Sequence, residues 1–119
     1  MKLKLKLTKG ELESLGRMAE AFVRTFRHER DFAVYSYVTA LEGFVVKQGF
    51  KFVSGGVKQK GNRLTLSDME TLAFHHILRV FGSSGMLSPY DDGVIRCVLE
   101  AIERQYDGEA MRRMARFNV

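Results

Sequence analysis

The stretch KLKLKLTKGE, residues 2–11, decides how the fold begins. Its first six residues alternate Lys and Leu, the period of a strand with one buried face, so its three leucines are expected to point inward. Thr8 and Glu11 then have the spacing of a capping box, in which each side chain accepts a hydrogen bond from the other residue's backbone N–H. The stretch therefore predicts a strand that leads directly into a helix.

Two helices are predicted after this strand, the first to about residue 28 and the second over about 32–48. Both carry apolar side chains at helical spacing, and the charged segment HERD (28–31) interrupts the stripe between them. Because the two stripes nearly agree in phase, one continuous helix over residues 9–48 is the alternative. The second helix is apolar over most of its surface, which is typical of a central helix or of half a dimer interface. Gly49 is its expected end.

Two further strands are predicted in the middle of the chain, at about 56–60 and 63–66. Residues 50–53 (FKFV) alternate with the period of a strand, and two more alternating runs flank Gly61-Asn62. Glycine in the first position of a two-residue loop favours a type II′ hairpin, so these two runs are expected to pair with each other.

The remaining helices are predicted from their start signals. Ser67 opens a second capping box, SDME, and its helix runs to about Phe81. Ser88-Pro89 begins another helix that runs to about Tyr106, and a short basic helix is predicted over 109–117. The segments LKLTKGELESL and LTLSDMETL resemble each other, a likeness that the shared strand-to-helix transition explains without duplication.

These elements predict one α+β domain over residues 1–119, with the order β-α-α-β-β-α-α. We expect a small, mainly antiparallel three-stranded sheet with four to five helices packed on one face. The order strand, helix, helix, hairpin is similar to that of winged helix-turn-helix proteins, and residues 60–63 would then be the tip of the wing. The resemblance is one of topology, because the second helix has Lys47 as its one clear cation, where a recognition helix presents several polar and basic side chains.

The composition is that of an ordinary globular domain. The chain of 119 residues is long enough to bury a core without disulfides, and its 45% hydrophobic and 28% charged residues exclude a disordered chain. No apolar run approaches the roughly 20 residues that cross a bilayer, and the alternating N-terminus lacks the apolar stretch of a signal peptide. The one cysteine excludes an internal disulfide and fits a reducing compartment. We therefore expect a cytoplasmic protein without membrane contact.

The net charge of +5 is expected to concentrate on the outer face of the predicted sheet. Without the six cations of that face, 13 Lys and Arg remain against 14 Asp and Glu. Such a face would bind the phosphates of nucleic acid or another polyanion, with an affinity that falls as salt rises. The alternative is that lysines on short strands only discourage edge-to-edge aggregation. The six residues are Lys2, Lys4, Lys6, Lys58, Lys60 and Arg63.

A second basic cluster is formed by Arg112, Arg113 and Arg116 near the C-terminus. Apolar residues alternate with these arginines, which is typical of an amphipathic segment that docks on a partner. Cations are also favoured at the C-terminal end of any helix, so the cluster has a purely structural explanation as well.

The residues that often carry catalysis do not form a motif in this chain. His75 and His76 are adjacent, about 100° apart on a helix, so they are poorly placed to hold one metal ion. Cys97 has no nucleophile motif around it, and Asp91-Asp92 is explained by the preference of a helix start for carboxylates. We therefore expect no enzyme, no metal and no cofactor.

Two functional hypotheses follow. The first is a small binding protein that meets nucleic acid through the basic sheet face. The second is a protein-interaction or assembly module, a homodimer formed through the apolar second helix, with no role for nucleic acid.

Overall fold

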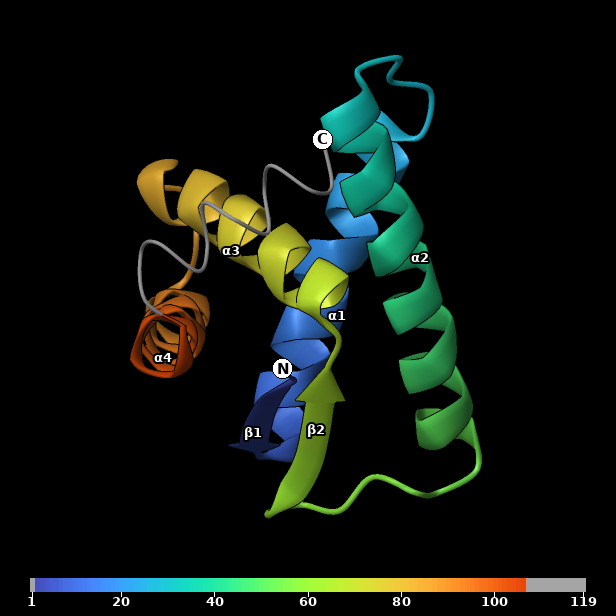
Figure 1. Cartoon of the computed structure of the whole chain (residues 1–119). Helices are drawn as coiled ribbons and strands as arrows, with labels where there is room; N and C mark the ends of the chain where they lie inside the picture. The colour runs from blue at the N-terminus through green and yellow to red at the C-terminus, as the bar shows by residue number, and fades with distance from the viewer. Residues whose placement is uncertain (1, 107–119) are drawn as a thin grey trace.

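The computed structural model describes residues 2–106, which form a mostly helical α+β fold (Figure 1). The described residues contain two strands and four helices. In chain order they are β1 (Leu3–Leu7), α1 (Lys9–Phe26), α2 (Phe32–Val53), β2 (Asn62–Leu66), α3 (Asp68–Ser83) and α4 (Pro89–Gln105). None of these helices combines the length and the apolarity that a membrane span needs.

The two strands form one antiparallel pair. Leu3 lies opposite Leu66, Leu5 opposite Leu64, and Lys6 opposite Arg63. Burial alternates along both strands, and the inward leucines of β1 are buried while its lysines are exposed, as the alternation in the sequence predicts. The register is specific because a slip by one residue would turn every leucine toward solvent.

The predicted three-stranded sheet is wrong because residues 56–60, one of its three strands, form no strand, and the predicted end of the second helix is wrong as well. This helix does not end at Gly49 but continues to Val53, through the segment that alternates like a strand. Phe52 packs against the core from the inner face of the helix, which keeps the last turn helical. The helix stops at Gly55, whose φ of 76° favours glycine, and there the Gly56 N–H donates to the Lys51 carbonyl oxygen at 2.8 Å.

The predicted hairpin around Gly61-Asn62 is also wrong, because residues 56–60 form no strand. The buried Asn62 side chain accepts a hydrogen bond from the Lys58 N–H at 2.7 Å and donates to the Lys58 carbonyl oxygen at 2.6 Å. The backbone of Lys58 is therefore satisfied by a side chain and not by a strand ladder. Since residues 54–61 are a loop, the likeness to a winged helix fails with the hairpin.

The predicted helix starts are confirmed. Thr8 and Ser67 form complete capping boxes, and Ser88 caps α4 with Pro89 in its first turn. The break between α1 and α2 is confirmed as well, so residues 9–48 belong to two helices, and Asp31 caps the second one. The predicted helix over 109–117 lies outside the described residues.

The core draws apolar side chains from every element. Phe44 of α2 and Phe74 of α3 are among its largest fully buried members, and their rings meet edge to face with centroids 4.8 Å apart. β1 contacts α4 and β2 contacts α3, and α2 stands at the outside of the molecule in Figure 1, packed on α1 and α3. One face of α2 is therefore left without a partner in the described residues.

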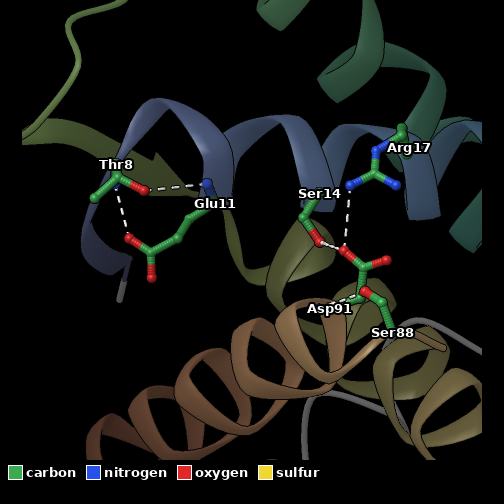
Figure 2. A network of polar contacts seen from close by, with 6 residues as sticks. All are labelled: Thr8, Glu11, Ser14, Arg17, Ser88 and Asp91. Atoms are coloured by element: carbon green, nitrogen blue, oxygen red, sulfur yellow. Dashed lines mark hydrogen bonds and ion pairs between the residues drawn. The ribbon is translucent and has the colours of Figure 1, made fainter.

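A buried carboxylate joins α4 to α1 (Figure 2). The hydroxyl of Ser14 donates to Asp91 Oδ1 at 2.6 Å, and Arg17 Nη2 lies 3.2 Å from the same oxygen. The hydrogen bond from Ser14 lowers the pKa of Asp91 more than burial raises it, and the charge of Arg17 lowers it further. Asp91 thus does more than occupy the first turn of α4, the one role that its sequence position predicts.

The two halves of the described chain follow the same plan of strand, capping box and two helices. Their strands meet in the middle of the sheet, where Leu5 lies opposite Leu64, its counterpart in the second half. The likeness between the segments that begin at Leu5 and Leu64 therefore extends to the order of their elements.

Candidate nucleic-acid interface

A basic cavity of about 590 Å³ lies where the C-terminal part of α2, the loop 54–61 and the sheet meet. Four separate segments supply its cations, and no acidic side chain lines it in the part of the chain that the structure describes. We call this feature the basic cavity. Its cations are Lys6 from β1, Lys51 from α2, Lys58 and Lys60 from the loop, and Arg63 from β2.

The cations are positioned by three parts of the fold, which are the sheet, the end of α2 and the loop 54–61. Lys6 and Arg63 are register partners on the outer face of the sheet, where both side chains are exposed. Lys51 lies in the last turn of α2, which the tertiary contacts of Phe52 keep helical. The basic cavity is therefore a product of sheet pairing and helix length together.

The loop that carries Lys58 and Lys60 is tied to the sheet by side-chain and backbone hydrogen bonds. Besides its two bonds to Lys58, the Asn62 amide donates to the Leu7 carbonyl oxygen at 3.1 Å. The Lys9 N–H donates to the carbonyl oxygen of Gln59 at 3.1 Å, which ties the loop to the start of α1. The loop thus has a defined path, and its two lysines flank the cavity.

Gln48 supplies a polar group to the same cavity from the inner face of α2. The residue is only 6% exposed, and its side-chain carbonyl oxygen has no hydrogen-bond partner among residues 2–106. A buried acceptor without a partner costs roughly 1–3 kcal/mol relative to a satisfied one. The wall of the cavity therefore holds an unsatisfied acceptor that is shielded from solvent, and a donor group of a ligand could reach it only after the Gln48 side chain turns toward the cavity.

The structure brings together four of the six cations predicted from the sequence, namely Lys6, Lys58, Lys60 and Arg63. Lys4 lies with Lys6 and Arg63 along a second hollow, of about 470 Å³, on the outer face of the sheet. Lys2 is exposed before the first register pair of the sheet. The arginine cluster at 112, 113 and 116 lies outside the described residues.

Sequence reasoning missed Lys51 and Gln48. Lys51 lies beyond Gly49, the predicted end of the second helix, and Gln48 lies just before it, so neither was assigned to a site. A signal for the correct assignment existed: Val45, Gln48 and Phe52 follow one another at helical spacing on the inner side of α2.

Two of the three histidines, His75 and His76, lie on another part of the surface, on α3. His76 stacks on the ring of Tyr37 with centroids 5.0 Å apart. Burial lowers the pKa of both His75 and His76, and the charge of the nearby Arg79 lowers each further. Within residues 2–106, no three His, Cys, Asp or Glu side chains come together as a metal site requires.

The chemistry of the basic cavity is that of anion recognition. Its described lining consists of cations, amides, glycines and apolar side chains, and includes no His, Cys, Ser, Asp or Glu. These groups can hold and orient an anion by charge and hydrogen bonds. Comparisons with family models, with curated proteins and with solved structures find no match to this chain.

Proposed function

We propose that this protein is a binding protein for nucleic acid, which it holds in the basic cavity and along the adjoining outer face of the sheet. The main observation behind this proposal is that five cations from four segments surround one cavity. No acidic side chain lines this cavity in the described part of the chain. Like charges that are close together destabilise a fold. A phosphate backbone would neutralise these charges and release its own counterions, which makes the interaction favourable.

Gln48 favours nucleic acid over a simple polyanion such as inorganic polyphosphate. Phosphate oxygens satisfy the cations, but they offer no donor to the unpartnered carbonyl oxygen of Gln48. A nucleotide carries both kinds of group, because its base or its 2′-hydroxyl can donate. A cavity of about 590 Å³ falls within the usual size range of small-molecule pockets, so it can accept one unpaired nucleotide of a strand.

The first experiment measures binding of a fluorescent single-stranded oligonucleotide by anisotropy at two salt concentrations. If about four phosphates are neutralised, the affinity should fall roughly 50-fold between 50 and 200 mM salt. The double variant K58A/K60A should bind more weakly and should lower the slope of log affinity against log salt by roughly 1.4. The matched control is R96A/R104A, which removes the same charge from exposed positions of α4. Equal losses in the two variants, or an affinity insensitive to salt, would contradict the proposal.

The second experiment separates nucleic acid from other polyanions. The variant Q48L keeps the approximate size of the side chain and removes its amide. It should weaken binding of the oligonucleotide and leave binding of inorganic polyphosphate unchanged. If Q48L binds both probes like the unmodified chain, Gln48 takes no part in recognition and the assignment to nucleic acid is wrong.

A cytoplasmic location belongs to the same proposal. It is supported by the single cysteine of the chain, Cys97, which is exposed and unpaired, as is usual for proteins of a reducing compartment.

A further inference from the structure

The outward face of α2 carries five large exposed apolar side chains, two near its start and three in its second half. Phe50 is 73% exposed and Val53 90%, and the others are each more than half exposed. Thr39 and Gly43 lie between these two groups and complete a row along the helix. We call this row the α2 outer stripe, and its members are Phe32, Tyr35, Thr39, Gly43, Val46, Phe50 and Val53.

The α2 outer stripe has a mirror-like order about the middle of the helix. The midpoint of α2 lies between residues 42 and 43. Phe32 and Val53 are equally far from this midpoint, and so are Tyr35 and Phe50. Thr39 and Val46 form the third equidistant pair. Two copies of the helix placed antiparallel would therefore set an apolar side chain of one copy against a stripe residue of the other at these three levels, while Gly43 would lie level with Glu42 of the other copy.

We infer that the protein forms a homodimer in which two copies of α2 pack antiparallel through this stripe about a two-fold axis. A two-fold interface uses the same surface on both copies, so each contact made by one residue pair occurs twice. Gly43 lies next to the axis, and a Cβ built there meets no atom within 4 Å in the single chain. Its lack of a side chain lets the two helices approach closely at the point where they cross.

A groove beside the stripe gives the second copy a place to insert. This groove has a volume of about 610 Å³ and is lined on one side by stripe residues and on the other by the start of α3. In the antiparallel arrangement, Phe50 of the second copy is level with Tyr35 and Ser36, which line the groove. The aromatic ring can therefore leave water without displacing any described element.

The exposed area also suits a second copy. The five large side chains of the stripe expose roughly 600 Å² on each chain, judged from the area of whole aromatic and aliphatic side chains. This is at the upper end of apolar patches on monomers and approaches the roughly 800 Å² per partner of a standard stable interface. Stripe residues at equal distances from the midpoint of α2 can face each other only when the partner is a second copy of the same helix. We therefore assign the stripe to self-association.

The inference does not depend on the nucleic-acid proposal. Gln48, which lines the basic cavity, is buried on the inner face of α2, whereas the α2 outer stripe is exposed on the opposite face. Substitutions in the stripe therefore leave the lining of the basic cavity unchanged.

The first test is the mass of the chain in solution by light scattering and sedimentation at about 200 µM, where a micromolar dimer is populated. The unmodified chain should have the mass of a dimer, and V46E should have that of a monomer with an unchanged circular dichroism spectrum. The control is V80E, which places the same charge on a valine of similar exposure in α3 and should remain a dimer. A monomeric unmodified chain, or equal dissociation by V46E and V80E, would overturn the inference.

The second test determines the orientation of the two helices by disulfide cross-linking in a C97S background. The double variant F32C/V53C should form a covalent dimer under mild oxidation, because position 32 of one copy faces position 53 of the other. The single variant V53C should not, since its two copies would lie about 30 Å apart along the helix pair. Efficient cross-linking of V53C alone would mean that the helices are parallel and would refute the arrangement.

Discussion

Replacing Asp91 by alanine tests whether one buried carboxylate holds α4 against α1. Asp91 is 8% exposed, and Ser14, which donates to it, is fully buried. The variant D91A removes the acceptor and leaves the Ser14 hydroxyl without its partner. Alanine is a good helix former, so the helix itself should persist.

The magnitude follows from these contacts. A hydrogen bond to a charged group contributes about 1.5–3 kcal/mol to stability, and its loss here leaves a buried hydroxyl unsatisfied. The ion pair with Arg17 adds less than about 1 kcal/mol, because the arginine side chain is 64% exposed. D91A should therefore lower the free energy of unfolding by about 2–3 kcal/mol at pH 7. Urea unfolding followed by circular dichroism measures this change directly.

The same contact makes a prediction about pH. Because the pKa of Asp91 is lower in the folded chain than in the unfolded chain, the folded state binds fewer protons in acid. The stabilisation is complete above about pH 4, the ordinary range of an Asp pKa, and is lost as the pH falls through the lowered value of the folded chain. The difference in stability between the unmodified chain and D91A should therefore shrink as the pH falls below about 4.

A double-mutant cycle with S14A decides whether the contact is the cause. The double variant S14A/D91A should be about as stable as D91A alone, with a coupling energy of at least about 1 kcal/mol between the two positions. Losses that simply add, or a destabilisation by D91A that is constant from pH 7 to pH 3, would refute this account of the contact.

Two further substitutions test the other polar contacts. Replacing Asn62 by alanine removes three hydrogen bonds to Lys58 and Leu7, so N62A should lose about 1–3 kcal/mol of stability and bind an oligonucleotide more weakly, while S83A, at an exposed position at the end of α3, should do neither. Anisotropy and urea unfolding of both variants measure this. Replacing Tyr106 by phenylalanine removes its hydrogen bond to Asp68, 3.0 Å long, and should cost about 1 kcal/mol. Burial, followed by the hydrogen bond to Asp68, raises the pKa of Tyr106 in the folded chain. The contribution of Tyr106 to folding stability is therefore present below about pH 10 and is lost as the pH rises above that. In alkaline unfolding experiments, Y106F should lose less stability over this range than the unmodified chain. An equal alkaline loss in both chains would show that Tyr106 does not titrate with unfolding.

The starts of the helices could be predicted from the sequence because they depend on neighbouring residues alone. A capping box needs only two side chains three positions apart. Thr8 and Glu11 can therefore form one independently of how the rest of the chain folds. The inward side of β1 is likewise predicted by its alternation, since successive side chains of a strand point to opposite faces. The cluster of cations at Lys58, Lys60 and Arg63 could also be predicted from the sequence, but the shape of the cavity that these residues line could not.

The partner of each strand could not be predicted in this way. The alternation of apolar and polar residues shows that a strand has one apolar face. It does not show which other segment of the chain pairs with that strand. The sequence favours a hairpin across Gly61-Asn62 because that contact is local, yet β2 pairs with β1 from the start of the chain. The core decides the outcome, since the leucines of both strands are buried together there and the Asn62 side chain occupies the backbone groups of Lys58.

The basic cavity depends on the same long-range choice. From the sequence alone, the cations of β1 and of the loop are only a predicted surface, and Lys51 and Gln48 belong to no site. Tertiary packing keeps Phe52 in the core, which extends α2 far enough to bring Lys51 to the loop and the sheet. Short segments of the chain thus determine the local hydrogen bonds and the alternation of apolar and polar residues. The lengths of elements and the pairing of strands instead depend on which apolar surfaces can be buried together in the folded chain.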